Sequence, residues 1–332
     1  MTIDRRTAML ATLGAAVAGK AVAQTAPPAV SGDALPLVLS EPSETIDLWP
    51  NGAPGMPAPR PVEVTTERST DPAHNDRAVV GVSVPRLAVF RPARPNGASL
   101  IAFPGGGYVR MAIDKEGYEI ARLLAAKGFT VFVLFYRLPG EGWADRADVP
   151  LQDAQRAVRL IRANAGKYGL DPARVAAMGF SAGGHLCADL AARFATSTYA
   201  PVDAADRLSA RPMIAAPIYP VVSMAPSLAH AGSRRALLGD DPTPEAVREH
   251  SPDLNIKTDS PPCFLCAAED DPTVPVGNTL LLHAALRGAK VPVELHLFEQ
   301  GGHGFGLRGV AGKPASAWPD LFLAWAKTRG WF

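Results

Sequence analysis

Two kinds of hydrophobic pattern alternate along the chain from about residue 79 onward. Short apolar runs followed by turn residues predict β-strands, and longer segments with apolar residues at helical spacing predict α-helices. The run TVFVLFYRLP at 130–139 is almost continuously apolar, which predicts a strand buried on both faces. The expected strands lie within 86–92, 98–107 (with its glycine turn), 130–139, 173–181, 212–222, 262–269 and 291–299. The expected helices are 116–128, 149–169, 182–195, 277–289 and 319–330.

Strand and helix alternate at a spacing typical of parallel sheets. This order predicts an α/β fold with a mostly parallel, doubly wound sheet and helices on both faces. The less regular segment 223–258 separates two expected strands and is predicted to form a small cap-like insertion over a site. We therefore expect one domain over residues 46–332.

The N-terminus has the pattern of an export signal. Arg5 and Arg6 precede a modest apolar stretch of small residues that ends in an A-x-A cleavage site at 21–23. The arginine pair resembles a bacterial twin-arginine signal, although a frayed helix with two chance arginines is an alternative. We expect residues 1–23 to be removed, 24–45 to form a flexible Pro/Ala-rich tail, and the mature protein to be periplasmic or secreted.

Composition narrows the possible partners. The 332 residues are 47% hydrophobic and 20% charged, with a net charge of +1. This balance predicts neither nucleic-acid binding nor attraction to an anionic membrane, and the N-terminal apolar stretch is too short for stable membrane insertion. The composition predicts no oligomeric state. Cys263 and Cys266 belong to an expected buried strand and point to opposite faces, so we interpret them as small core residues rather than a metal or redox pair.

Ser181 lies in the sequence Gly179-Phe-Ser-Ala-Gly183, directly between an expected strand and an expected helix. A nucleophile at such a sharp turn adopts strained backbone angles, so its neighbours must be small. The following helix start would place backbone N–H groups beside the reacting oxygen. We predict that Ser181 is a nucleophile.

A second glycine-rich loop follows the strand near residue 100. The run Gly105–Gly107 allows backbone N–H groups to turn toward a developing oxyanion. The loop is similar to the HGGG loop of esterases, with Pro104 in the usual place of histidine. A tight turn or a phosphate-binding loop are alternatives, but the chain lacks the phosphate-binding glycine motifs.

A base and an acid follow Ser181 in the chain. His303 lies in a glycine-rich loop where little can pack against it, which suits an imidazole that reaches across a cleft. Glu269, Asp270 and Asp271 end a strand before it, and any of the three could orient the base. We favour Asp271 because it precedes Pro272 just past the strand end, with Asp270 as the alternative. The order Ser, Asp, His is that of the hydrolases.

The motifs PGGGY, DPARVAAMGFSAGGHL, DDPTVPVGN and GGHGFG together resemble the α/β-hydrolase superfamily, and in particular secreted bacterial esterases of the acetylxylan-esterase and hormone-sensitive-lipase-like type. The resemblance implies a triad of Ser181, Asp271 and His303. It also implies an oxyanion hole from the N–H groups of Gly106, Gly107 and Ala182. Pro104 departs from the family pattern and weakens any transfer of lipase-type substrate preference.

The resemblance implies a serine esterase acting on short-chain carboxylic esters, with O-acetyl groups on plant-type polysaccharides or oligosaccharides as the expected substrates. A general short-chain carboxylesterase or a feruloyl-type esterase is the alternative, followed by an acyltransferase, a peptidase or a non-catalytic binding protein. The mechanism needs no metal and no organic cofactor. Tyr108, beside the glycine loop, and Trp143 are candidate substrate contacts, with packing as the equal alternative.

Overall fold

The computed structural model describes residues 41–332, and the predicted export signal and most of the predicted tail lie outside the described residues. An eight-stranded sheet crosses this part of the chain in the order β1-β4-β7-β5-β8-β9-β10-β11. From β7 to β11 neighbouring strands are parallel, whereas β1 and β4 pair antiparallel at one edge. The strands are β1 (Glu44–Asp47), β4 (Arg86–Phe90), β5 (Ser99–Phe103), β7 (Thr130–Phe135), β8 (Val175–Phe180), β9 (Ile214–Ile218), β10 (Cys263–Ala268) and β11 (Val293–Phe298).

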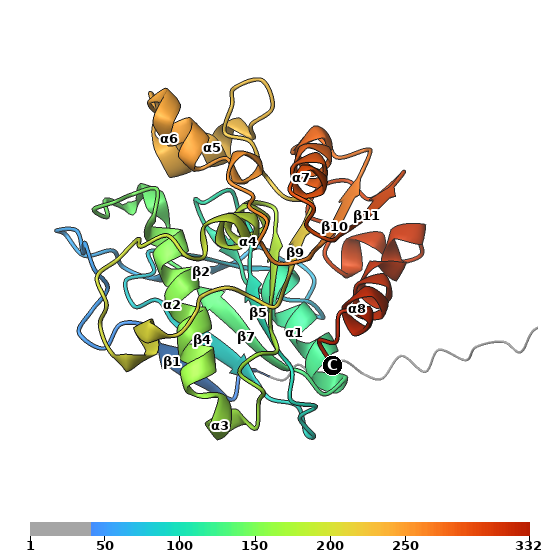
Figure 1. Ribbon diagram of the computed structural model, residues 1–332, viewed down its shortest axis with the longest axis horizontal. Helices are drawn as coiled ribbons and strands as arrows, with labels where there is room; N and C mark the ends of the chain where they lie inside the picture. Colours follow the sequence, from blue (N-terminus) through green and yellow to red (C-terminus); the bar gives the residue numbers. More distant parts are fainter. Residues whose placement is uncertain (1–40) are drawn as a thin grey trace, which may run out of the picture. The chain divides into compact units, whose positions relative to one another are not determined.

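Helices cover the two faces of this sheet (Figure 1). Figure 1 shows the central strands between α2 on one side and α1 with α8 on the other. Every residue of β5, β7, β8, β9 and β10 is buried, as expected for strands covered on both faces. The helices are α1 (Glu119–Ala126), α2 (Val149–Ala163), α3 (Ala165–Tyr168), α4 (Ala182–Arg193), α5 (Ala231–Leu238), α6 (Pro244–Glu249), α7 (Gly277–Gly288) and α8 (Trp318–Thr328). The predicted mostly parallel α/β architecture is confirmed.

A second, three-stranded sheet lies outside the sequence prediction. It pairs β2 (Val64–Glu67), β3 (Arg77–Val80) and β6 (Met111–Ala112) in antiparallel fashion. The sheet joins the segment after Gly107 to residues far earlier in the chain. It thereby brings the loops around Arg68 and Arg110 toward the same region.

Two predicted boundaries differ from the structure. Glu44 and Thr45, assigned to the tail, belong to β1 and pair with β4. A four-residue edge strand with every second residue exposed leaves little hydrophobic signal in the sequence. The helix expected over 149–169 ends at Ala163 and resumes as α3, because the Asn164 side chain donates to the carbonyl of Leu160 at 2.8 Å.

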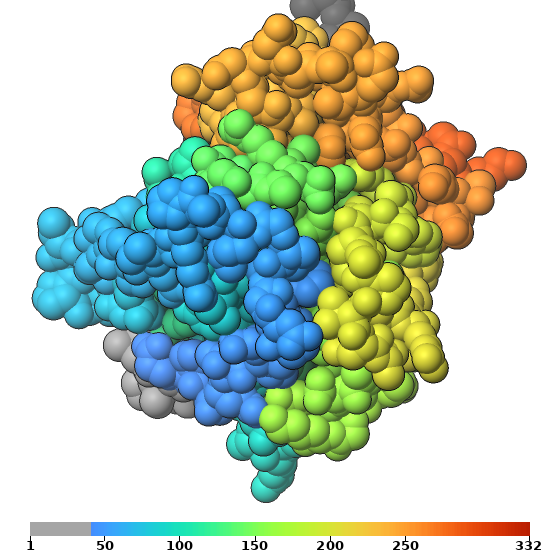
Figure 2. All heavy atoms as spheres, turned by 90° about the vertical axis from the view of Figure 1, so that its left-hand side faces the viewer, coloured from blue at the N-terminus to red at the C-terminus, as the bar shows by residue number. Residues whose placement is uncertain are grey.

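The segment 223–258 contains α5, α6 and a short 3₁₀ turn at Pro252–Leu254. Figure 2 shows it, in orange, beside the green segment around residue 146. Arg146 joins the two segments by donating from Nε to the carbonyl of Ala236 at 3.0 Å.

Cys263 and Cys266 are free and buried within β10, as expected of core residues. No helix within residues 41–332 combines the length and the apolar character needed to cross a bilayer.

Candidate active site

Ser181 occupies a strained turn between β8 and α4. Its φ of 54° and ψ of −116° lie in a region that non-glycine residues rarely adopt. The flanking glycines permit this turn, because a Cβ on Gly179 would come within 2.0 Å of the carbonyl oxygen of Gly183. A Cβ on Gly183 would come within 2.1 Å of the carbonyl oxygen of Phe103. The turn therefore depends on small residues on both sides of the serine.

The turn brings Ser181 to His303, which is 122 residues away in sequence. Ser181 Oγ lies 2.8 Å from Nε2 of His303, and Nδ1 of His303 lies 2.7 Å from Oδ2 of Asp271. The other carboxylate oxygen of Asp271 accepts from the backbone N–H groups of Thr273 and Val274 at 2.8 and 2.9 Å. The Asp271 side chain is only 2% exposed, so it is oriented toward the imidazole and shielded from water.

Asp270 has a different partner from Asp271. Its Oδ1 accepts from the N–H groups of Gly301 and Gly302 at 2.8 and 2.7 Å. The hydrogen bond from Gly302, together with the one from Gly301, holds the pKa of Asp270 below its ordinary value. Asp270 thus braces the backbone of the loop that carries His303 rather than the imidazole itself.

The glycine loop after β5 borders Ser181. Gly106 and Gly107 line the same cleft and have φ of 131° and 68°, which favour glycine. Ala182, the first residue of α4, has a backbone N–H without an acceptor inside the helix. Pro104 stands where esterases carry histidine, and its carbonyl accepts from the Tyr136 hydroxyl at 2.6 Å. The predicted oxyanion residues are therefore adjacent to the nucleophile.

Glu116 is a site residue that the sequence analysis missed. It lies in a π-helical turn at Asp114–Tyr118 and lines the cleft. Its Oε2 accepts from the N–H of Gly105 at 2.9 Å, and its Oε1 accepts from the hydroxyl of Tyr219 at 3.0 Å. Tyr219 in turn accepts from the N–H of Gly306 at 3.1 Å. Glu116 therefore links the glycine loop to the loop of His303.

Burial sets the protonation preference of Glu116. The side chain is removed from water, which raises the pKa of its carboxyl above the usual value despite the hydrogen bond from Tyr219. A glutamate within a helical, otherwise amphipathic segment offers no sequence signal for this role. Only the folding of the glycine loop over the turn reveals it.

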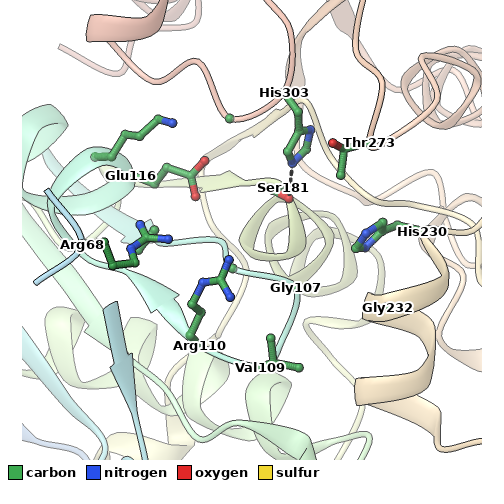
Figure 3. Close-up of a pocket in the computed structure, with 14 residues that line it drawn as sticks. Arg68, Gly107, Val109, Arg110, Glu116, Ser181, His230, Gly232, Thr273 and His303 are labelled. Carbon is green, nitrogen blue, oxygen red and sulfur yellow. Dashed lines mark hydrogen bonds between the residues drawn. The ribbon is translucent and has the colours of Figure 1, made fainter. Parts of the chain in front are cut away.

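These residues surround an open cleft of about 410 Å³. His230, from the segment 223–258, also lines the cleft and is a second site residue that the sequence analysis did not identify. Its Nδ1 accepts from the N–H of Ser233 at 3.2 Å, and burial, followed by the nearby His303, lowers its pKa. The cap-like segment thus contributes to the site. Figure 3 shows the bonded pair Ser181 and His303, with Arg68, Arg110 and Glu116 on one side and His230 and Thr273 on the other.

Tyr108 and Trp143, the predicted substrate contacts, do not line this cleft. Tyr108 is 1% exposed, and its hydroxyl bonds Nδ1 of His185 at 2.8 Å. Trp143 is buried, with the guanidinium of Arg137 5.1 Å from its ring centroid. Both rings are buried in the core, and Tyr108 also lines an adjacent cavity that shares Val109 and Gly232 with the cleft. His185 is buried as well.

Within residues 41–332, one cluster has the composition of a cation site: Asp148, Glu249 and His250. The guanidinium of Arg193 already lies among them. Its Nη2 donates to Asp148 at 2.9 Å and to Glu249 at 2.8 Å, and its Nη1 lies 3.1 Å from Nδ1 of His250. The cluster is therefore an arginine-centred ion-pair network.

The sequence matches the BD-FAE family over residues 89–286. The chain belongs to the BD-FAE family. Residues 244–332 also match the dienelactone hydrolase family. The BD-FAE match contains Ser181 and Asp271, and the second match contains Asp271 and His303. The suspected relationship to α/β-hydrolase esterases is confirmed.

Two curated relatives of this BD-FAE chain have names that refer to xylan. This chain is 38% identical over 205 residues to endo-1,4-beta-xylanase B of Butyrivibrio fibrisolvens, and the match covers 62% of this chain and 32% of the relative. It is 32% identical over 225 residues to an acetylxylan esterase of Xylanibacter ruminicola, covering 67% of the chain and 44% of the relative. The chain therefore spans less than half of either relative's length.

A solved structure matches this BD-FAE chain over nearly its whole length. It is the acetyl ester-xyloside bifunctional hydrolase of Caldicellulosiruptor lactoaceticus, with a TM-score of 0.72, 34% identity, and coverage of 89% of this chain and 99% of that one. A carboxylesterase of Lactobacillus plantarum, at 23% identity and a TM-score of 0.62, shares the fold. Ester hydrolases, the enzyme class predicted from the sequence, are thus among the proteins to which this chain is similar.

Proposed function

We propose that this protein hydrolyses short-chain carboxylic esters, chiefly O-acetyl groups on plant-type polysaccharides or oligosaccharides, through Ser181, His303 and Asp271. The single observation that carries the proposal is the hydrogen-bonded chain of these residues, with links of 2.8 and 2.7 Å, at a strained strand-to-helix turn. The acetyl preference is supported by the similarity to an acetylxylan esterase and to an acetyl ester-xyloside hydrolase.

In the first step Ser181 Oγ attacks the ester carbonyl carbon while Nε2 of His303 takes the hydroxyl proton. Asp271 keeps the proton of the imidazole on Nδ1 and stabilises the imidazolium. The carbonyl oxygen becomes an oxyanion, which the N–H groups of Gly106, Gly107 and Ala182 stabilise. The bond to the alcohol then breaks, and His303 returns the proton to the departing oxygen.

In the second step a water molecule replaces the alcohol. His303 takes a proton from this water, whose oxygen attacks the acyl-serine carbonyl. The second tetrahedral intermediate uses the same oxyanion donors, and its collapse releases the acid and restores the Ser181 hydroxyl. All of these steps use groups of this chain and the solvent.

The test combines labelling with hydrolysis. A fluorophosphonate probe should label Ser181, and Ser181→Ala should lower kcat for 4-nitrophenyl acetate on the order of a million-fold. Ser316→Ala is the matched control, because Ser316 is exposed on a turn away from the cleft. Full esterase activity in Ser181→Ala would refute the assignment of the nucleophile.

The acyl preference needs its own measurement. In a pocket that fits acetate, each unaccommodated methylene costs about 1–3 kcal/mol of transition-state binding. Values of kcat/KM should therefore fall from acetate to butyrate to octanoate esters, and acetylated xylan should release acetate. Preference for octanoate, or no acetate from any acetylated glycan, would favour the alternative of a general carboxylesterase.

We also propose export to the periplasm or the medium, from the predicted signal at 1–23. An exported enzyme would meet glycan fragments outside the inner membrane, which suits the proposed substrates.

The fate of the acyl group distinguishes an esterase from an acyltransferase. Transfer of the acyl group to an added alcohol rather than to water would point to an acyltransferase.

A further inference from the structure

The wall of the cleft that holds Ser181 carries three cationic side chains. Arg68 follows β2, Arg110 precedes β6, and Lys115 lies in the turn before α1. They come from segments that the small sheet brings together. Glu116 is the single acidic residue among the described residues that line this cleft. A cleft for a neutral acetylated sugar has no need of such a surplus of positive charge.

Arg110 is the cation nearest to the glycine loop. A Cβ placed on Gly106 would lie 3.0 Å from Cγ of Arg110 and 2.3 Å from its carbonyl oxygen. The residue is exposed, and within residues 41–332 no hydrogen bond or ion pair engages its guanidinium. Its five N–H donors are therefore available to a ligand that is bound beside the oxyanion hole.

Lys115 and Arg68 extend this charge along the wall. A Cβ on Gly304, the residue after His303, would lie 3.6 Å from Nζ of Lys115. Arg68 donates from Nη2 to Oδ1 of Asp76 at 2.7 Å and from Nε to the carbonyl of Asp76 at 3.1 Å. These contacts hold Arg68 in place and offset part of its charge. Arg110 and Lys115 thus supply most of the unbalanced charge.

Glu116 offsets at most one of the three cationic charges on the wall. Both of its oxygens already accept hydrogen bonds, from Gly105 and from Tyr219. Its burial disfavours the charged form, which is the direction of its pKa shift. His230, across the cleft, has its pKa lowered and adds little positive charge at neutral pH. The cations therefore keep a net positive potential next to the nucleophile.

We propose that this cationic wall, formed by Arg68, Arg110 and Lys115, binds a carboxylate carried by the substrate beside the scissile ester. The preferred substrates are then acetyl esters of carboxylated alcohols. Such a carboxylate comes either from a uronic acid unit of an acidic glycan or from a small carboxylated phenol. Arginine suits this role because its planar donors match a carboxylate in a bidentate manner. The inference rests on the proposed function, since it names the substrate class of the same site.

The experiment compares matched acids and neutral esters. One pair is 4-acetoxybenzoate and its methyl ester, and the other is an O-acetyl methyl glucuronoside and the corresponding O-acetyl methyl glucoside. In each pair the ratio of kcat/KM, acid over neutral, is measured for the native protein and for Arg110→Gln. Comparing the same pair between variants cancels the intrinsic difference in ester reactivity.

The ratio should fall about tenfold in Arg110→Gln, the scale of one charge-assisted hydrogen bond. It should also fall with rising salt in the native protein, because the wall is solvent-accessible. Arg207→Gln removes the same charge at an exposed position outside the cleft and should leave the ratio unchanged. The pair whose ratio falls further from the native protein to Arg110→Gln identifies the source of the carboxylate.

An Arg110→Gln variant whose ratios for both pairs equal the native ones would overturn the inference, even if it loses activity on every ester. If the neutral esters are hydrolysed but the ratios do not change in Arg110→Gln, the proposed carboxylate binding is refuted and the proposed esterase function is not. Absence of hydrolysis of all four esters refutes the proposed function and the inference with it.

Discussion

Asp270 accepts a hydrogen bond from the N–H of Gly302 at 2.7 Å, one residue before the histidine that Asp271 orients. Two adjacent acids thus hold the same loop in different ways. Asp270 fixes its backbone, and Asp271 fixes the imidazole of His303. Their side chains differ in exposure as well, since Asp271 is shielded and Asp270 faces solvent.

The two acids are expected to differ strongly when each is changed to asparagine. Asp271→Asn should lower kcat for 4-nitrophenyl acetate roughly 10⁴-fold, because the amide favours the wrong tautomer of the imidazole. Asp270→Asn keeps an oxygen acceptor for the glycine N–H groups and should cost about tenfold or less. Steady-state kinetics at pH 7.5 measures both. A larger loss in Asp270→Asn would transfer the orienting role to Asp270.

Glu116 is expected to act as a positioning residue. Glu116→Ala leaves the Gly105 N–H and the Tyr219 hydroxyl without their acceptor and should lower kcat roughly 10–100-fold, the scale of an unpaired buried group. In Glu116→Gln the side-chain carbonyl oxygen can still accept from the N–H of Gly105, and the side-chain NH2 group can donate to the oxygen of Tyr219. This variant should therefore keep most of the native kcat. Thermal unfolding of both variants separates this effect from general destabilisation. Equal losses in Ala and Gln would show that the negative charge itself is required.

The glycine after Ala182 is expected to be sterically indispensable. Gly183→Ala forces its Cβ against the carbonyl of Phe103, so we expect roughly 1–3 kcal/mol of lost stability and a misplaced Ser181. Gly166→Ala is the matched control, because a Cβ there meets nothing within 4 Å and α3 gains a better helix former, by up to about 1 kcal/mol. Urea unfolding and fluorophosphonate labelling of each variant provide the measurement. Native-like labelling and stability in Gly183→Ala would contradict the close approach.

His185 is expected to make the fold acid-sensitive. Burial lowers its pKa from 6.5 to about 4, so the folded chain holds it neutral while the unfolded chain gains a proton below pH 6.5. The free energy of unfolding should therefore fall as pH drops from 6.5 toward 4, by about 3 kcal/mol from this group. His250, whose pKa is also lowered by burial, adds in the same direction.

Urea midpoints across this pH range test the assignment. His185→Gln should flatten the profile, whereas His74→Gln, at an exposed position, should leave its slope nearly unchanged. An unaltered slope in His185→Gln would show that other groups dominate the acid response.

Export is expected to depend on the arginine pair near the N-terminus. Replacing Arg5 and Arg6 by lysines should retain the protein in the cytoplasm, and the exported native protein should begin near Gln24. Cell fractionation and N-terminal sequencing measure these outcomes. Normal export of the double-lysine variant would indicate the general secretory route.

Local sequence patterns were sufficient to predict the alternation of strands and helices and to recognise the motif around Ser181. A fully buried strand must be apolar along its length, and a strained nucleophile turn must be flanked by glycine, so both features are visible without tertiary structure. His303 and Asp271 could be selected because their loops follow strand ends that a parallel sheet brings to one edge. The short strands β1 to β3 escaped prediction because each has only four residues, too few to show a periodic hydrophobic signal.

The sequence by itself therefore determined the fold class and the identity of the Ser, Asp and His candidates. Tertiary structure alone decided that Glu116 and His230 lie in the cleft and that Tyr108 and Trp143 lie outside it. It also assembled Arg68, Arg110 and Lys115 into one wall. The physical reason is that steric and hydrophobic requirements act locally and therefore limit which residue type can stand at each position. The direction in which a loop side chain points is set by contacts with segments distant in the chain.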